Sequence, residues 1–333
     1  MTDPVSPASR PTMKDVAQLA GVSLKTVSRH VNGQQIGTDF SKRIASAIEQ
    51  LGYRRNLAAA ALRPGQASMV LGMVISDLAN PYFSRLADEV ESVARRFGYL
   101  LMIASSDDEG ATNDALIERL IDQRVDGLLV VPPHLAGRDW GRHRSMMPPT
   151  VSIDRPLGDE FDAVLMDDYE GGRLAAGALL ANRPRRIAMI TDSLAIHTMN
   201  RRHAGMVQAV AEDGSRAEML VDAGAHTLAQ AKAIALRLLD DELLDGIFAA
   251  NNRSALGTLL AFRERGRRVP LVCLDDFEAA TVLDPAVSVV SHDFTATAEA
   301  ALDLLLRRTK GWDGPPEQVT IPVNLILRGS EKP

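Results

Sequence analysis

Short apolar runs alternate with amphipathic stretches of helical periodicity from residue 70 to residue 274. Continuous apolar runs, typical of strands buried on both faces, occur at 70–75, 100–104, 127–131, 186–190, 219–221, 246–249 and 271–274. Helical stretches lie between them, at 82–97, 115–122, 202–211, 228–239 and 255–265. This alternation predicts parallel sheets flanked by helices. Because about 265 residues exceed one comfortable core, we expect two similar lobes.

The N-terminal part of the chain has a different pattern, which predicts a small all-α region. Apolar residues at helical spacing indicate helices over 13–20, 24–31 and 39–51. Gly21 is expected to end the first of these helices. Ser23 has the side chain of a good N-cap for the second.

Charge is distributed unevenly along the chain. Residues 1–63 carry a net charge of +5, whereas the total of −6 leaves −11 for the remainder. A basic N-terminal region on an acidic body predicts contact with nucleic acid at one end only. The single cysteine, Cys273, excludes an internal disulfide and suits a reducing cytosol. We expect neither a signal peptide nor a membrane span, because no apolar run is long enough.

Several ordered motifs resemble one family of regulators. The segment from residue 13 to residue 33, MKDVAQLAGVSLKTVSRHVNG, resembles the N-terminal domain of the lactose-repressor family. Further matching segments are Leu51–Tyr53, Asn56–Leu62, Asn80–Phe83, Arg124–Leu128, Ile153–Pro156, Ala249–Asn251, Asp275–Asp276 and Arg328–Ser330. The resemblance therefore covers nearly the whole chain. It implies a transcription regulator, in which a helix-turn-helix domain precedes a two-lobed domain like that of periplasmic binding proteins, with two parallel doubly wound sheets.

The resemblance also implies how the chain is divided. We expect a disordered tail over 1–11, a helix-turn-helix DNA-binding domain over 12–55, a hinge helix and linker over 56–68, and a two-lobed effector-binding and dimerisation domain over 69–333. The first lobe is expected to comprise about 69–163 and 294–320, and the second about 164–293 and 321–333.

The second N-terminal helix is expected to read DNA. Val27 and Val31 are four residues apart and should face the first helix, which leaves the opposite face free to enter the major groove. By resemblance, Leu24, Lys25 and Arg29 are expected to read bases, and Thr26 and Ser28 can donate hydrogen bonds to phosphates. Packing in the core is the alternative for Leu24, and an ordinary solvated lysine is the alternative for Lys25. The remaining DNA-contact candidates are Asn32, Tyr53, Asn56 and Leu62.

The alanine-rich segment from Asn56 to Leu62 resembles the hinge helix of the family. Seven residues are too few to hold a helix alone, so we expect the hinge to order only when two copies pair on DNA. By resemblance, Leu62 would then wedge into the central base step and kink the duplex. The alternative is an ordinary linker that ends in a leucine.

Polar residues that follow the expected strands predict a ligand site. Ligands of two-lobed parallel sheets bind beyond the carboxyl ends of the strands, where the candidates are Asn80, Phe83, Asp154, Asn251 and Asp275. The resemblance adds Arg202, His226 and the pocket-wall residue Phe294. Asp, Asn and Arg side chains suit a polyhydroxyl ligand, because each makes two hydrogen bonds of fixed geometry. A polar role in a solvated loop or helix cap is the alternative for each residue alone.

Three departures from the family pattern put an unmodified hexose in doubt. His226 stands where an aromatic residue is common, Asn252 where an aspartate is common, and Cys273–Leu274 where a glycine-aromatic pair is frequent. His226 could bring pH sensitivity or bind an anionic group, and a plain surface histidine is the alternative.

Together these features predict a cytoplasmic homodimeric repressor. Its partners would be a pseudo-palindromic double-stranded operator and a small-molecule effector that resembles a sugar. We expect no metal, cofactor or catalytic residue, since neither metal-ligand spacing nor a catalytic signature is visible. A solute-binding transport receptor would share the two-lobed body but would need a signal peptide and no basic N-terminal region. An enzyme would need a catalytic constellation in the cleft.

Overall fold

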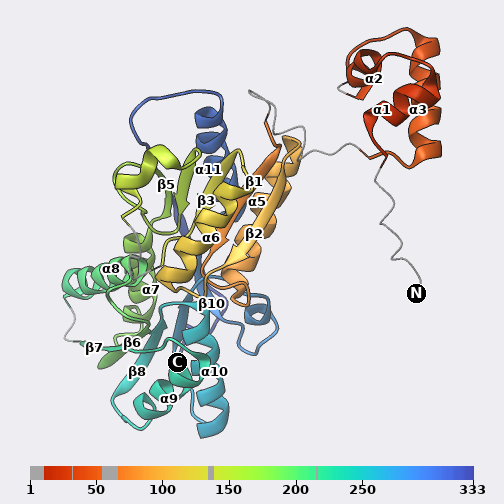
Figure 1. Ribbon diagram of the computed structural model, residues 1–333. Coiled ribbons are helices and arrows are strands. Elements are labelled where there is room, and N and C mark those ends of the chain that lie inside the picture. The colour runs from red at the N-terminus through yellow and green to blue at the C-terminus, as the bar shows by residue number, and fades with distance from the viewer. Residues whose placement is uncertain (1–10, 32, 55–66, 134–138, 215–216) are drawn as a thin grey trace, which may run out of the picture. The chain divides into compact units, whose positions relative to one another are not determined.

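The chain forms two compact units, one up to Ser68 and one from Met69. The computed structural model describes residues 11–31, 33–54, 67–133, 139–214 and 217–333. We call the first unit the head and the second unit the body. Figure 1 shows the elements of both units along the chain.

The head consists of three helices, as the sequence predicts. They are α1 (Met13–Ala20), α2 (Leu24–Val31) and α3 (Thr38–Leu51). The hydroxyl of Thr12 and the carboxylate of Asp15 form a reciprocal capping box at the start of α1. This local hydrogen bonding fixes where the first helix begins.

A tight turn joins α1 to α2. Gly21 has a φ of 62°, a left-handed conformation that costs glycine little and that ends α1. The Ser23 hydroxyl accepts a hydrogen bond of 3.1 Å from the backbone nitrogen of Thr26, which confirms Ser23 as the cap of α2. The small apolar core beneath this turn comprises Val16, Ala17, Ala20, Val27, Ile44 and Ala47.

The first sheet of the body has six parallel strands in the order β11-β5-β4-β3-β1-β2. Its strands are β1 (Val70–Ile75), β2 (Leu100–Ser105), β3 (Gly127–Val130), β4 (Thr150–Ile153), β5 (Asp162–Met166) and β11 (Gln318–Ile321). Helices α5 (Pro81–Arg96), α6 (Gly110–Asp122) and α11 (Phe294–Thr309) pack against it. The short 3-10 helix η1 (Gly141–Met146) precedes β4. We call this half of the body the first lobe.

The second sheet repeats this plan in the order β12-β10-β9-β8-β6-β7. Its strands are β6 (Arg186–Thr191), β7 (Glu218–Ala223), β8 (Leu244–Ala249), β9 (Leu271–Leu274), β10 (Ser288–His292) and β12 (Val323–Ile326). Helices α7 (Asp168–Leu180), α8 (His197–Asp213), α9 (Leu228–Leu238) and α10 (Asn252–Arg265) belong to this second lobe, with the 3-10 helix η2 (Glu278–Thr281). Among the described strands of this sheet, β12 departs from the expected parallel order, because it runs antiparallel to β10.

The chain passes between the lobes at residues 167, 293 and 322, so each lobe is built from separate stretches of sequence. In Figure 1 the blue helix α11 therefore lies among the orange and yellow elements of the first lobe. The expected break near residue 163 is wrong by about three residues, because Val164 to Met166 pair with Val319 to Ile321 and complete the first sheet. Among the described helices, none combines the length and the apolar character that a membrane crossing requires.

Helices α7 and α8 approach each other unusually closely at two glycines. A Cβ at Gly172 would lie 1.9 Å from the carbonyl oxygen of Arg202, and a Cβ at Gly205 would lie 1.9 Å from that of Tyr169. Only glycine allows the two backbones to meet in this way. This contact holds Arg202 beside Asp168, at the start of α7.

Candidate functional site

The exposed face of α2 presents the base-reading candidates. Lys25 and Arg29 are one turn apart and exposed, whereas Val27 between them is completely buried. Leu24 is 43% exposed, so the alternative of packing in the core of the head is wrong. The side chain of Arg29 donates hydrogen bonds of 3.3 Å to the Gln34 side chain and to the Gln35 carbonyl oxygen. These bonds orient the guanidinium at the end of α2.

The remaining DNA-contact candidates of the head are less exposed than Lys25 and Arg29 or lie outside the described residues. The hydroxyl of Thr26 is 2.8 Å from that of Ser23, and Ser28 is partly buried. Tyr53 is partly buried and packs against the head core, so much of its ring has a structural role. Asn32, Asn56 and Leu62 lie outside the described residues.

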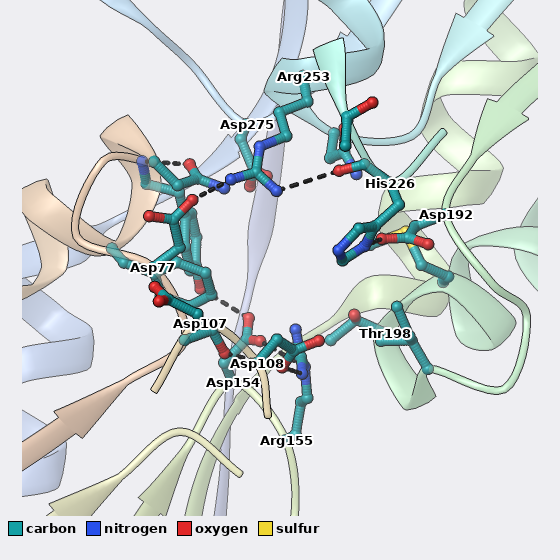
Figure 2. A pocket seen from close by; sticks show the side chains of 18 of the residues that line it. Asp77, Asp107, Asp108, Asp154, Arg155, Asp192, Thr198, His226, Arg253 and Asp275 are labelled. Carbon is teal, nitrogen blue, oxygen red and sulfur yellow. Dashed lines mark hydrogen bonds and ion pairs between the residues drawn. The ribbon is translucent and has the colours of Figure 1, made fainter. Parts of the chain in front are cut away.

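A cavity of about 410 Å³ opens between the two lobes of the body. Seven of the eight predicted effector residues line it: Asn80, Phe83, Asp154, Arg202, His226, Asn251 and Asp275. Figure 2 shows how the polar side chains of both lobes converge on this space. The rule that ligand sites lie beyond the carboxyl ends of parallel strands explains the placement, since Asp154 follows β4 and Asp275 follows β9.

Phe294, the eighth candidate, does not line the cavity. It is the first residue of α11 and is 2% exposed. Its ring packs against those of Tyr82 and His292, at centroid distances of 5.4 and 4.3 Å. The assignment of Phe294 to the pocket wall is therefore wrong, because Tyr82 takes the position facing the cavity and Phe294 supports it from the core.

Arg202 is the buried centre of the charged cluster at this site. Its Nε donates to Asp168 at 2.7 Å and its Nη1 donates to the carbonyl oxygen of Ala250 at 2.6 Å. A second carboxylate, that of Asp275, lies 3.9 Å away. Burial alone would lower the pKa of Arg202, but Asp168, Asp275 and Asp154 raise it above its usual value. The guanidinium is therefore a permanent charge that aligns the surrounding carboxylates.

Burial raises the pKa of the two carboxyl groups next to Arg202. The pKa of Asp168 rises to about 7 and that of Asp275 to about 6, although Arg202 opposes both shifts. The nearby charge of Asp154 adds to both rises. Three carboxyl groups, those of Asp154, Asp168 and Asp275, thus surround the buried guanidinium of Arg202 at this end of the cavity.

Asp154 links two further side chains to the cavity. Tyr82 donates its hydroxyl to Asp154 Oδ1 at 2.9 Å, and the Nε of Arg155 lies 3.3 Å from Oδ2. Burial, followed by the charge of Asp154, raises the pKa of Tyr82 well above its usual value, so the phenol stays protonated as a donor. Arg155 also donates to Asp108 at 2.7 Å.

Among the described residues, two pairs of polar side chains bond across the cavity from one lobe to the other. Arg253, on α10, pairs with Asp77, which follows β1. Asn252 donates from Nδ2 to Asn80 Oδ1 at 2.8 Å. Asn252, which replaces the aspartate common in the family, therefore contributes to the contact between the lobes. We call these two contacts the interlobe bridges.

The ring of His226 forms a hydrogen bond with Asp192 at the cavity edge. The distance from Nδ1 to Oδ2 is 2.9 Å, and the side chain of His226 is 53% exposed. Figure 2 shows this pair on the side of the cavity opposite Asp77. His226 therefore lines the cavity, and its ring lies beside a carboxylate.

Several lining residues were not among the sequence candidates: Asp77, Asp107, Asp108, Arg155, Asp192, Thr198 and Arg253. Asp107 and Asp108 follow β2, and Asp192 follows β6, so the same strand-end rule identifies them once the strand ends are known. Asp107, Asp108, Asp154 and Asp275 also have positive φ values between 53° and 74°. Such backbone strain concentrates at functional sites.

Two segments of the chain match family models of known proteins. Residues 12–56 match the model described as "Bacterial regulatory proteins, lacI family", and residues 176–331 match "Periplasmic binding protein-like domain". The HTH-type transcriptional regulator GalS of Salmonella typhimurium is 31% identical over 308 residues, which cover 90% of each chain.

Two solved structures show the same fold. The Cra transcriptional dual regulator of Pseudomonas putida, solved in complex with fructose 1-phosphate, is 25% identical and has a TM-score of 0.72 over 78% of this chain and 98% of its own. A lac repressor dimer, bound to operator and an anti-inducer, is 24% identical and has a TM-score of 0.84 over 97% of this chain and 99% of its own.

Proposed function

Because this chain belongs to the lacI family of bacterial regulatory proteins, we propose that it is a homodimeric repressor that binds a pseudo-palindromic operator under the control of a sugar-like effector. The chain is a DNA-binding transcription regulator, as its named relatives are. The basic head, which a solute-binding transport receptor lacks, favours this function over transport.

The observation that carries the proposal is the face of α2. Ser23 caps this helix, Val27 holds it to the head core, and Lys25 and Arg29 remain exposed on one side. A helix held in this way can lie in the major groove, where Lys and Arg donate to guanine O6 and N7. We assign base reading to Leu24, Lys25 and Arg29, and backbone contacts to Thr26, Ser28, Asn32, Tyr53 and Asn56.

The segment between head and body completes the DNA-binding part of the proposal. We assign the DNA-binding domain to residues 12–55 and the hinge and linker to 56–68. Two hinges would pair in the minor groove, with Leu62 as the apolar wedge. Ordering each hinge costs free energy, so the spacing between the two bodies of a dimer would decide whether the hinges pair.

Control by the effector would act through the angle between the lobes. The interlobe bridges, Asp77 with Arg253 and Asn80 with Asn252, join the walls of the cavity. A ligand that bridges the same walls would bind one lobe arrangement more tightly than the other. That difference in affinity is what couples the cavity to the operator, typically by about 1–3 kcal/mol.

An apolar edge of the first lobe suits the dimer contact. Strand β2 is the edge of its sheet, and the exposed apolar side chains on and beside it are Phe97, Leu100, Met102 and Ile103. An unpaired apolar strand edge is usually covered by a partner. We propose a second copy of this chain as that partner, because the family works as dimers on two-fold operators.

The base-reading face is tested by fluorescence anisotropy with the full chain and duplexes from upstream of its own gene. Each of Lys25→Ala and Arg29→Ala should weaken specific binding by about 1–3 kcal/mol and leave binding to random duplex less affected. Lys310→Ala, on the body surface, is the control and should change neither affinity. Equal losses of both variants on specific and random duplex would show that these side chains contact only phosphates.

A further inference from the structure

The described part of the chain places three arginines in the cavity wall, and each of them already forms hydrogen bonds within the protein. Each guanidinium pairs with at least one aspartate and also donates to a main-chain carbonyl. The partners are Asp108 and the Pro132 carbonyl for Arg155, Asp168 and the Ala250 carbonyl for Arg202, and Asp77 and the His226 carbonyl for Arg253. An anionic ligand group would have to displace these partners before it could bind an arginine.

Carboxylates exceed guanidiniums in the cavity wall by six to three. The six are Asp77, Asp107, Asp108, Asp154, Asp192 and Asp275. Asp107 is exposed at the cavity and forms no ion pair among the described residues, where it accepts a 3.4 Å hydrogen bond from the hydroxyl of Ser105. Among the described residues, the side-chain partner of Asp192 is His226, and its Oδ1 accepts a further hydrogen bond from the backbone N–H of Ser193. The wall is therefore rich in acceptors of hydrogen bonds and poor in free cationic donors.

Asp275 is a second, independent observation, and it indicates that the ligand carries a hydrogen-bond donor. It is 4% exposed, lines the cavity, and its Oδ1 has no hydrogen-bond partner among the described residues. A buried carboxylate oxygen without a donor costs free energy, so a ligand that supplies a donor gains affinity there. A hydroxyl or an ammonium group can supply this donor, whereas an ionised phosphate or carboxylate group cannot.

From this geometry we propose that the effector is a polyhydroxyl compound that bears a protonated amine and no phosphate or carboxylate, an amino-sugar-like ligand, whose ammonium binds Asp107 while a hydroxyl donates to Asp275. The inference deepens the proposed function, since it assumes that the effector occupies this cavity.

The ligand class is tested by isothermal titration of the full-length protein with matched sets of sugars. Each set shares one skeleton of glucose, galactose, mannose or ribose, and contains the neutral sugar, its amino derivative, its phosphate and its acid. We expect at least one amino derivative to bind at least tenfold more tightly than its neutral parent, and no phosphate or acid to bind more tightly than that amine. A phosphate or acid as the tightest ligand, or no binding by any amino derivative, overturns the proposal.

Two variants distinguish a specific contact between Asp107 and the ammonium group from a general effect of removing one negative charge. Asp107→Asn should weaken the amino derivative at least tenfold and the neutral parent less than twofold. Asp213→Asn, a surface aspartate at the end of α8, removes the same charge outside the cavity and should change neither affinity. Equal weakening of amine and neutral sugar by Asp107→Asn contradicts the ammonium contact.

Operator binding distinguishes failure of this inference from failure of the proposed function. Both variants should bind the operator as the parent protein does when no sugar is present. A protein that binds its operator and responds only to phosphorylated sugars contradicts the inference and leaves the regulator function intact. A protein that binds no operator contradicts the proposed function itself.

Discussion

At the scale of single residues, the buried charges around Arg202 dominate the chemistry of the body. Asp168 and Asp275 are each less than 5% exposed, and both are paired with or close to one guanidinium. Burial disfavours their ionised forms, while Arg202 favours them. The balance leaves both carboxyl groups with raised pKa values, which makes the stability of the body depend on pH.

A first prediction follows for Asp168, whose pKa is about 7 in the folded protein against 3.8 as its usual value. Between these values the folded state binds more protons than the unfolded state, so the free energy of unfolding falls as pH rises from about 4 to 7. Asp168→Asn should remove this contribution, which amounts to about 1.4 kcal/mol per pH unit at its steepest.

Urea unfolding at several pH values checks this effect through tryptophan fluorescence, since Trp140 and Trp312 both lie in the body. The difference in unfolding free energy, variant minus parent, should increase steadily up to about pH 7 and then level off. Parallel curves for the two proteins across this range would contradict the raised pKa.

A second prediction concerns Arg202 itself. Arg202→Ala would leave Asp154, Asp168 and Asp275 without their shared guanidinium, which should lower the unfolding free energy of the body by about 3–5 kcal/mol at pH 8. Arg202→Lys keeps the charge and should lose less. Equal stability of the alanine variant and the parent would show that this cluster is not held by Arg202.

At the scale of elements, the contact between α7 and α8 at two glycines positions the charged cluster around Arg202. Both helices must come close enough for Gly172 to lie against the Arg202 backbone and Gly205 against the Tyr169 backbone. The position of the guanidinium relative to Asp168 therefore depends on two residues that have no side chain.

A third prediction uses this contact. Gly172→Ala or Gly205→Ala places a Cβ on a backbone oxygen, so the helices must separate, at a cost of about 1–3 kcal/mol or more in unfolding free energy. Gly177→Ala on the same α7 is the matched control. A Cβ there meets nothing within 4 Å, so this variant should gain up to about 1 kcal/mol from helix propensity. Destabilisation of all three variants alike would contradict the packing explanation.

Elements with clear local signals were predicted from the sequence to the residue. The bounds of α1, α2 and β9 agree with the predicted ranges, because Gly21, Ser23 and continuous apolar character mark their ends. The first turns of α6 and α8 were missed. Their N-cap residues, Glu109 and Ile196, make no side-chain capping bond, so the sequence carries no start signal there.

The candidate site was predicted less completely than the fold. Asp154 and Asp275 were found because they directly follow recognisable apolar strands. Asp77 and Arg253 were missed, since their pairing depends on how the two lobes face each other, which no local pattern encodes. Phe294 was misplaced for the same reason, because only the packed structure shows Tyr82 in front of it.

At the scale of the whole molecule, the body has two lobes joined by three chain crossings and two interlobe bridges. The side chains of Asp77 and Arg253 are 23% and 34% exposed, so their ion pair contributes only about 0–1 kcal/mol. A weak contact of this kind can be exchanged for ligand contacts at little cost, as a regulated cleft requires.

A fourth prediction tests the bridge between Asp77 and Arg253 by hydrogen exchange. Arg253→Ala should speed exchange of the amides at the start of α10 and after β1, because the cavity walls separate more often. Arg265→Ala is the control, since it breaks an exposed pair with Asp240 inside the second lobe. Unchanged exchange in the Arg253 variant would show that the bridge does not hold the lobes together.

The most direct test of the central claim is the affinity of the full-length protein for duplexes from upstream of its own gene, measured against random duplex at several salt concentrations. A sequence-specific regulator predicts one fragment bound at least about 10³-fold more tightly than random DNA, with affinities that fall steeply as salt rises. Equal affinity for every fragment, or no binding even at low salt, would contradict the account.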